Sequence, residues 1–411
     1  MLNLLWLTPV SLNLDGSRRT TGGWLDALCS SLVAGGGVRV TAVCPNGAAV
    51  TVSLRRGELV TSSWEPWRRI WSAPRLAEAI RLLGIKSISR SDRQKILMEC
   101  LDSEQFDLVH VHGTESTWMQ TASGLTLPRV LSIQGILTYC SVGFWSGLSS
   151  CDVQWSPRLW LRYHDLCCRA QIERQYLPAY SHVLCQGTYA QQFVTRFSGR
   201  SIALEDGRIL RGAFYCGQSW AAAHRRRPVV FSTLAAQPYK GVHHVLTALS
   251  RPGMKPFVFQ VAGVPPSSEY GRILRRISNR LGVADQVQLL GNLDASELRQ
   301  RLLDADLYLH PSTEENTPNA LAEAMALGLP CVVSRLGGSV GYIREGVSGI
   351  SFDPLDPNEA SDCIRRVCAD HTLRTRLGAA AREESLARHD PARVTRLTID
   401  AYHQVLNDFT Q

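Results

Sequence analysis

The chain has 411 residues, of which 45% are apolar and 19% charged, and its formal net charge is +8. This length favours two domains, and the composition is that of a globular protein, which excludes a low-complexity or fibrous chain. The basic excess favours anionic partners such as nucleotides, phosphorylated lipids or an anionic membrane surface. No nucleic-acid-binding motif accompanies the excess, so nucleic acid is not an expected partner.

Cysteine usage and the N-terminus bear on the compartment. The twelve cysteines are dispersed, with no CxxC pair at zinc spacing, which favours buried, reduced thiols in a cytosolic protein. The N-terminus lacks the basic region and cleavage site of a signal peptide. No apolar run reaches the length of about 18 residues that a membrane-spanning helix needs. We expect a cytoplasmic protein that at most lies peripherally on the inner membrane.

Strands and helices alternate along both halves of the chain. The opening strand, helix and strand form a βαβ unit, which implies a parallel sheet. In the first half we expect strands at 2–7, 38–43, 108–112, 130–133 and 182–185 and helices at 24–34 and 159–175. In the second half we expect strands at 229–232, 257–262, 286–290, 306–310 and 331–334 and helices at 242–249 and 318–327, with a capping box at Asp294 and Glu297.

The stretch 221–228 has the composition of a linker, with small residues, three arginines and a proline. The predicted fold is therefore α/β, with two doubly wound Rossmann-like domains that face each other across a cleft. We expect an N-terminal domain at 1–222, a C-terminal domain at 223–394, and a final helix at 395–411 that packs back on the N-terminal domain.

The segment from His310 to Pro330 carries the most information. A strand ends at His310, a loop with two glutamates follows, and Thr317 and Pro318 suit the N-cap and first position of a helix. The backbone amides of Asn319 and Ala320 would then face the loop, where they could bind an anion or a hydroxyl-rich ligand.

This segment resembles the E-x7-E motif of retaining GT-B glycosyltransferases, in particular glycosyltransferase family 4, through Glu315 and Glu323 and the following Ala-Met-Ala-Leu-Gly-Leu-Pro. The resemblance implies that Glu323 binds the ribose hydroxyls of a nucleotide-sugar donor and that Glu315 binds its sugar. A carboxylate suits both tasks because it accepts paired hydrogen bonds. The residues expected around the donor here are Asn316, Thr317, Asn319 and Ala320.

A lysine after the first strand of the second half fits the same family. Lys240 in Gln-Pro-Tyr-Lys-Gly matches the lysine that holds the donor diphosphate. An arginine that the family often carries a few residues earlier is replaced here by Ser232-Thr233-Leu234. The second diphosphate cation is therefore missing or comes from elsewhere in the chain.

Two glycine pairs also resemble donor-side turns of the family, namely Gly22-Gly23 after the first strand and Gly337-Gly338 after the strand at 331–334. A simple tight turn is an equally good interpretation of the second pair. Arg18 and Arg19, beside the first pair, could meet an anionic acceptor or be ordinary exposed loop arginines.

The run Asp107 to Gly113 matches the family's aspartate-strand-histidine pattern, although His110 and His112 fit strand histidines better than catalysts. Gln134 stands where many members have a histidine that contacts the donor sugar. A glutamine could donate a hydrogen bond there but could not carry a proton. The segment 205–215 resembles a stretch in bacterial polysaccharide-assembling members.

The resemblance predicts a retaining glycosyltransferase that moves a sugar from a nucleotide-sugar to a glycan or lipid-linked acceptor in cell-surface polysaccharide biosynthesis. Lys240, Glu315 and Gln134 are its expected catalytic residues. No cofactor or metal is expected, since Lys240 and helix amides can hold the diphosphate and no Asp-x-Asp motif occurs. Two alternatives on the same fold remain open: a sugar-nucleotide-binding protein without turnover, and a nucleotide-sugar epimerase.

The segment 63–75 holds Trp64, Trp67 and Trp71 interleaved with arginines. Tryptophan prefers the membrane–water interface, and arginine pairs with lipid phosphate. The segment therefore predicts either a short membrane-facing patch in the acceptor-side domain or tryptophans packed onto the N-terminal sheet.

Overall fold

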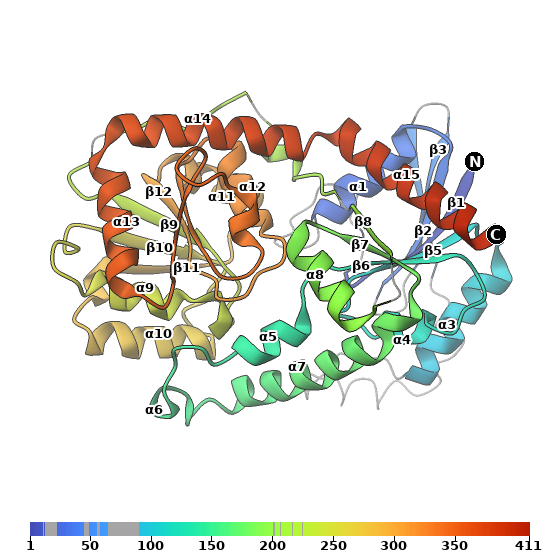
Figure 1. Cartoon of the computed structure of the whole chain (residues 1–411), viewed down its shortest axis with the longest axis horizontal. Helices are drawn as coiled ribbons and strands as arrows, with labels where there is room; N and C mark the ends of the chain where they lie inside the picture. The colour runs from blue at the N-terminus through green and yellow to red at the C-terminus, as the bar shows by residue number, and fades with distance from the viewer. Residues whose placement is uncertain are drawn as a thin grey trace.

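The computed structural model describes residues 1–10, 12, 23–44, 49–55, 58–64, 90–199, 202–205, 207–215, 217–223 and 225–411. Two α/β domains lie side by side, each built on one sheet with helices on both faces (Figure 1). In the described part of the chain, no helix is long and apolar enough to cross a bilayer.

The N-terminal sheet has the order β4-β3-β2-β1-β5-β6-β7-β8. The six strands β2, β1, β5, β6, β7 and β8 pair in parallel, whereas β3 and β4 add an antiparallel edge. The strands are β1 (Leu2–Leu7), β2 (Val38–Val43), β3 (Ala49–Arg55), β4 (Glu58–Trp64), β5 (Leu108–His112), β6 (Arg129–Ser132), β7 (His182–Cys185) and β8 (Ile202–Glu205).

Helices cover both faces of this sheet because its central strands are apolar on both sides. One face packs against α3, α4 and α8, and the other packs against α1 and the C-terminal helix α15. The helices in the first half are α1 (Gly23–Ala34), α3 (Arg90–Ser103), α4 (Trp118–Ala122), α5 (Leu137–Gly143), α6 (Ser150–Val153), α7 (Pro157–Tyr176) and α8 (Thr188–Phe197).

The C-terminal sheet has the order β11-β10-β9-β12-β13-β14 and is parallel throughout its described strands. The strands are β9 (Val229–Thr233), β10 (Val258–Ala262), β11 (Val287–Gly291), β12 (Leu307–His310), β13 (Cys331–Ser334) and β14 (Ile350–Phe352). The helices are α9 (Val242–Leu249), α10 (Glu269–Arg280), α11 (Ala295–Leu303), α12 (Asn319–Ala326), α13 (Pro357–Ala369), α14 (His371–Arg388) and α15 (Pro391–Thr410).

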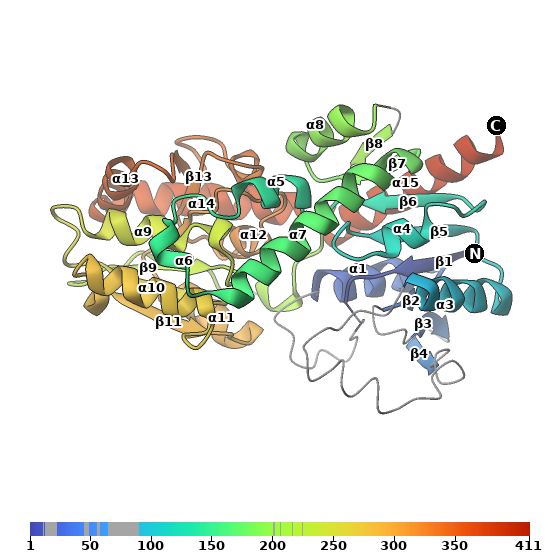
Figure 2. The same ribbon diagram turned by 90° about the horizontal axis from the view of Figure 1, so that it is seen from below.

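Two connections tie the domains together. Leu159 and Leu166 of α7 pack into the core of the C-terminal domain. The other end of the helix reaches the 3-10 helix η2 (Leu177–Ala179) and α4 of the N-terminal domain (Figure 2). In the opposite direction, α15 leaves the C-terminal domain and lies on α1. Its Tyr402 hydroxyl lies 2.7 Å from Nδ1 of His110 in the N-terminal sheet. Segments from each half of the sequence therefore complete the other half's core.

The predicted fold of two parallel-sheet α/β domains is confirmed. The Asp294–Glu297 capping box is confirmed as well. The antiparallel edge formed by β3 and β4 was not predicted. His110 and His112 are buried strand histidines, stacked on each other with ring centroids 3.7 Å apart, and burial lowers the pKa of His110 to about 3.

Candidate donor site between the domains

The site is a cavity of about 760 Å³ that both domains line. It opens where the carboxyl ends of the parallel strands of each sheet meet, which is where doubly wound folds bind ligands. Nine of the predicted site residues line this cavity: Gly23, Gln134, Lys240, Glu315, Asn316, Thr317, Asn319, Ala320 and Glu323. The E-x7-E segment, the lysine turn and the end of β6 are therefore brought to one place.

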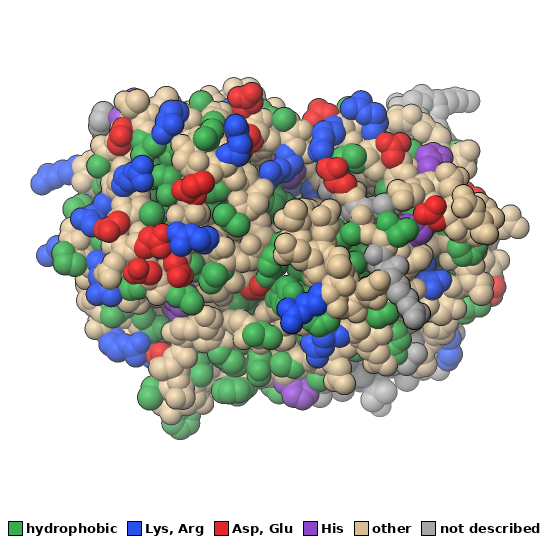
Figure 3. Space-filling model, in the orientation of Figure 1, with side chains coloured by type: hydrophobic (Ala, Val, Ile, Leu, Met, Phe, Trp, Pro, Cys, Tyr) green, Lys and Arg blue, Asp and Glu red, His purple; other side chains and the backbone are tan. Residues whose placement is uncertain are grey.

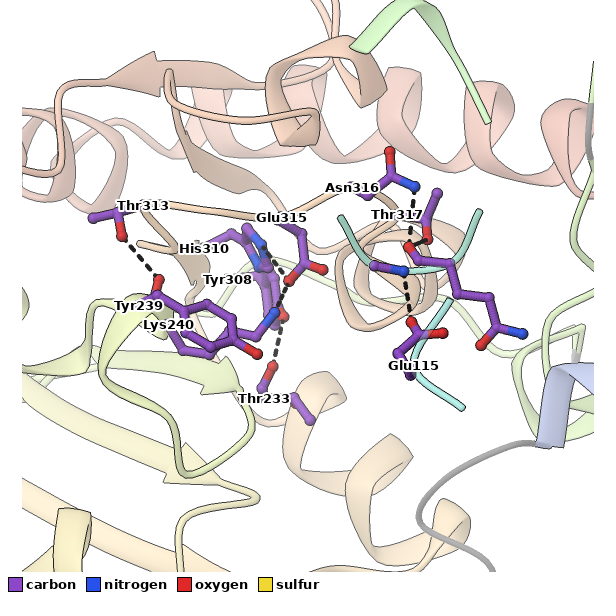
Figure 4. Close-up of polar contacts among 12 residues, drawn as sticks. Glu115, Thr233, Tyr239, Lys240, Tyr308, His310, Thr313, Glu315, Asn316 and Thr317 are labelled. Carbon is purple, nitrogen blue, oxygen red and sulfur yellow. Dashed lines mark hydrogen bonds and ion pairs between the residues drawn. The ribbon is translucent and has the colours of Figure 1, made fainter. Parts of the chain in front are cut away.

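Lys240 and Glu315 form an ion pair at the centre of the C-terminal wall. Lys240 Nζ donates to Glu315 Oε2 at 2.5 Å, although 75 residues separate them (Figure 4). Gly241 makes this approach possible: its φ is +73°, and a Cβ there would lie 2.1 Å from the carbonyl oxygen of Pro311. The glycine after Lys240 thus lets the β9–α9 turn touch the β12–α12 loop.

Both members of this pair are charged over a wide pH range. Burial lowers the pKa of Lys240, but the Glu315 carboxylate outweighs burial and holds the pKa above its usual value. Burial raises the pKa of Glu315, and Lys240 outweighs it in turn, so the pKa lies below its usual value. His310 lies beneath the pair, with Nε2 3.7 Å from Glu315 Oε2, and burial lowers the pKa of His310 to about 4.

Glu323 is held by a second cation. Arg211 Nε and Nη2 each donate to one of its carboxylate oxygens at 2.7 Å, which is a bidentate pair. Arg211 comes from the segment that joins the domains, whereas Glu323 is buried on α12. Burial raises the pKa of Glu323, and Arg211 lowers it in part. A ribose that binds Glu323 would have to share or displace this arginine.

The N-terminal end of α12 differs from the prediction. The helix begins at Asn319 with Pro318 as N-cap, so the predicted N-cap at Thr317 is wrong. The Thr317 hydroxyl instead donates to the carbonyl oxygen of Gln134 at 3.2 Å, across the domain interface. Asn316 Nδ2 donates to the same oxygen at 3.0 Å. The Asn319 amide donates to the Thr317 carbonyl, so it is not free to face a ligand in this conformation.

The backbone carbonyl and the side-chain amide of Gln134 have different surroundings. Its carbonyl oxygen ties the β6 end of the N-terminal domain to Asn316 and Thr317 of the E-x7-E loop. Its side-chain Nε2 is buried and has no hydrogen-bond partner among the described residues. Glu115 lies next to it and accepts a 2.6 Å hydrogen bond from the Gly135 amide. Sequence reasoning missed Glu115, which lies in a loop without a motif.

Glu314 precedes the motif glutamate and lines the same cavity. The Tyr189 hydroxyl, from α8 of the N-terminal domain, donates to Glu314 Oε2 at 2.7 Å. Burial is the main cause that raises the pKa of Glu314 to about 7. The loop thus presents two adjacent carboxyl groups in different states near neutral pH: Glu315 is ionised, whereas Glu314 is partly protonated.

Arg208 is a cation of the cavity that sequence reasoning did not single out. It is buried to 4% exposure, and its guanidinium carbon lies 4.0 Å from the centroid of Trp24 on α1. Its charge helps to hold the pKa of Glu315 below its usual value. At Glu115, burial raises the pKa and the charge of Arg208 offsets part of that rise. Thr233, where the family often has an arginine close by, lines this cavity too. The sequence feature that could have indicated Arg208 is its place as a basic residue in the segment 205–215, which resembles a stretch in related polysaccharide-assembling enzymes.

The two predicted glycine turns lie in different places relative to the donor cavity. Gly23 begins α1 and lines the cavity, while Gly22, Arg18 and Arg19 lie outside the described residues. Gly337 and Gly338 pack behind the E-x7-E loop, where the Gly338 amide donates to the Glu315 carbonyl at 2.6 Å. They line a second cavity, also of about 760 Å³, and not the first. Donor contact by these two glycines stays a prediction.

The close packing explains why glycine occupies both positions. A Cβ at Gly337 would lie 2.9 Å from backbone atoms of Glu315, and one at Gly338 would lie 2.6 Å from the Asn316 carbonyl oxygen. Either side chain would push the loop that carries Glu315 out of place. The pair therefore supports the shape of the donor-side loop from behind.

Solved structures of the same architecture identify the fold class. Sucrose-phosphate synthase from Thermosynechococcus elongatus superposes with a TM-score of 0.70 at 16% sequence identity, covering 99% of this chain and 100% of that chain. HepE of Anabaena, in complex with UDP and glucose, superposes with a TM-score of 0.64 at 14% identity, covering 98% and 100%. The fold is GT-B, as the motifs predicted.

The sequence places the chain more narrowly. Residues 220–384, within the C-terminal half of the chain, match the family model described as glycosyl transferases group 1. The lipopolysaccharide core biosynthesis glycosyltransferase LpsE of Rhizobium meliloti is 29% identical over 180 residues, 44% of this chain and 49% of that protein. A D-inositol 3-phosphate glycosyltransferase of Thermobifida fusca is 32% identical over 108 residues, 26% of this chain and 25% of that protein. The matches therefore span about half or less of these relatives.

Proposed function

We propose that this protein is a glycosyltransferase that takes a sugar from a nucleotide-sugar bound in the interdomain cavity. One observation carries the proposal: the lysine turn and the E-x7-E loop, 75 residues apart, meet as a charged pair inside a cavity that both domains line. The family model that matches residues 220–384 and the names of the chain's relatives support it.

In this proposal the donor diphosphate lies against Lys240 and Arg208. Both are buried cations, and in a site of reduced dielectric they can stabilise the negative charge that develops when the diphosphate departs. Lys240 is already paired with Glu315, so a diphosphate would share the lysine with that carboxylate. Arg208 supplies the second cation that the sequence lacks at Ser232-Thr233-Leu234.

The two glutamates then act at opposite ends of the donor. Glu323 receives the ribose hydroxyls once Arg211 makes room, and Glu315 receives the hydroxyls of the sugar. Gln134, whose side-chain amide has no described partner, supplies a hydrogen bond from the N-terminal side. Nothing in this arrangement requires a protein nucleophile on the sugar, so we propose attack on the face that the diphosphate vacates, with retention of configuration.

For the acceptor we propose a glycan or a lipid-linked saccharide of cell-surface polysaccharide biosynthesis. Support for this acceptor comes from LpsE, a glycosyltransferase of lipopolysaccharide core biosynthesis. HepE, which has the same fold and is complexed with UDP and glucose, supports a nucleotide-sugar donor. We further propose that the reaction needs no metal ion, because Lys240 and Arg208 can neutralise the diphosphate. Full loss of activity in EDTA, restored by manganese, would contradict that part.

A donor panel tests the proposal. The protein is incubated with UDP-sugars and GDP-sugars, with and without saccharide acceptors, and the sugar products are separated and identified. Transfer to an acceptor, or slow hydrolysis of one donor, is the expected result. An epimerised nucleotide-sugar, or tight binding of the donor with neither transfer nor hydrolysis, would instead favour one of the two alternatives. Product with inverted configuration would refute the proposed stereochemistry.

A further inference from the structure

A surface on α6, α7 and α10, away from the donor cavity, combines exposed arginines with exposed tryptophan and leucine. We name it the α7/α10 surface and define it by Trp155, Arg158, Trp160, Leu161, Arg162, Arg272, Arg275, Arg276 and Arg280. The three helices adjoin in both ribbon views (Figures 1 and 2). It is distinct from the tryptophan segment 63–75, of which Trp67 and Trp71 lie outside the described residues.

Helix α10 has one apolar face and one basic face. Tyr270, Ile273, Leu274 and Ile277 are buried in the core of the C-terminal domain. The exposed outer face of α10 consists of Arg272, Arg275, Arg276, Asn279 and Arg280. An amphipathic helix of a soluble domain usually mixes acids and bases on its outer face, and here the exposed positions carry one sign of charge.

Large apolar side chains stand beside these arginines without being covered. Trp155 is 79% exposed and Leu161 is 70% exposed. Trp155 lies over a shallow hollow lined by Arg272, Arg275 and Arg276. Trp160 is 47% exposed and packs on Trp145, with ring centroids 4.7 Å apart. In Figure 3, hydrophobic side chains reach the surface along the lower edge, over α6 and the start of α7.

The carboxylates near this surface are already engaged with neighbouring groups. Asp152 is buried and binds Arg280 at 2.9 Å. Glu269 accepts from the backbone amides of Arg158 and Leu159 at the start of α7, and its Oε1 lies 4.0 Å from Nη2 of Arg272. Asp165 pairs with Arg169 in the next turns of α7. The exposed charge that remains is strongly positive.

We infer that the α7/α10 surface docks onto a bilayer that carries anionic phospholipids. Arginine guanidinium groups pair with lipid phosphate, and an amphipathic aromatic ring is most stable at the level of the headgroups. Trp155 and Leu161 supply apolar side chains that can enter the interface, and the surrounding arginines supply the attraction. Helix α7 also contacts α5, whose Leu137 and Cys140 line the donor cavity.

The test is co-sedimentation of the full chain with phosphatidylcholine vesicles that contain, or lack, about a third phosphatidylglycerol. We expect binding to the anionic vesicles and little to the neutral ones. Each arginine at a membrane surface is worth about a fivefold change in affinity, so the triple variant R272S/R275S/R276S should bind about 100-fold more weakly. A matched triple variant of exposed arginines elsewhere, R301S/R366S/R376S, should bind as the wild type does.

Trp155 provides a second readout. Brominated lipid should quench part of the tryptophan fluorescence of the wild type, and W155F should lose that part while its unfolding curve stays unchanged. Absence of wild-type binding to anionic vesicles, or equal binding by the two triple variants, would overturn the inference. So would binding to single-stranded DNA that the α10 triple variant loses and W155F keeps, if vesicles are not bound. None of these outcomes depends on glycosyl transfer.

Discussion

Two ion pairs in the donor cavity, Lys240–Glu315 and Arg211–Glu323, use the same chemistry in different ways. The first joins two loops of one domain through one short contact, and Gly241 fixes the approach. The second is bidentate and joins α12 to the segment between the domains. The first pair is therefore set by the rigid C-terminal sheet, whereas the second depends on how the interdomain segment lies. The part of the site expected to bind the sugar and the diphosphate is therefore already formed, whereas the part expected to bind the ribose can change with the path of the interdomain segment.

Removing the first pair should have the largest effect. Lys240→Ala should lower turnover by about 10²-fold or more, because the departing diphosphate loses a buried cation. Initial rates of transfer or donor hydrolysis measure this change, and thermal unfolding checks that the fold persists. Lys255→Ala removes an exposed lysine of the same domain and should leave the rate unchanged. Near-normal turnover in Lys240→Ala would take the lysine out of the site.

The two glutamates should separate turnover from binding. Glu315→Ala should lower kcat by about 10²-fold, since the sugar gains positive charge in the transition state. Glu323→Ala should weaken UDP binding by about tenfold, because one charge-assisted hydroxyl contact is lost.

A thermodynamic cycle that compares UDP with 2′-deoxy-UDP, on wild-type protein and on Glu323→Ala, tests whether Glu323 binds the ribose. The deoxy ligand should bind wild-type protein more weakly than UDP, and the difference should vanish in Glu323→Ala. Calorimetric titration measures all four affinities. A preference for UDP that persists in the variant would assign the ribose to another residue.

Arg208 should contribute through the diphosphate alone. Arg208→Met should weaken UDP binding by about tenfold, the cost of one charge-assisted hydrogen bond, and leave uridine binding unchanged. Uridine is the internal control, because it carries the base and ribose without phosphate. Equal losses for UDP and uridine would mean that Arg208 acts by supporting Trp24 and the cavity wall.

Glu314 should give the smallest effect, which is a change in how the free energy of unfolding depends on pH. Its pKa of about 7 in the folded protein is above its value in an unfolded chain. The folded state then holds the extra proton between about pH 4.5 and 7, so this group's contribution falls as the pH rises through that window. Denaturant unfolding should show that fall in wild type and less of it in Glu314→Gln. Identical pH profiles would show that Glu314 titrates normally.

The sequence predicted the strands of the C-terminal domain well, because each strand of a parallel sheet buried on both faces is a continuous run of apolar residues. The family resemblance assigned Lys240 and Glu315 to the same donor, and the two residues meet because they follow the neighbouring strands β9 and β12. The pairing of Glu323 with Arg211 could not be predicted, since it depends on the path of the segment between the domains. The antiparallel β3–β4 edge was missed because its two strands, of seven residues each, mix polar and apolar residues and do not form an apolar run. Thr317 was assigned as an N-cap because its hydroxyl can cap a helix, but the Gln134 carbonyl of the other domain competes for that hydroxyl.

A crystal structure of the protein with UDP tests the central claim most directly. The account predicts the β-phosphate within hydrogen-bonding distance of Lys240 Nζ and the ribose hydroxyls on Glu323, with Arg211 displaced from at least one carboxylate oxygen. Phosphates bound instead in the second cavity, behind Gly337 and Gly338, with both ion pairs intact, would contradict it.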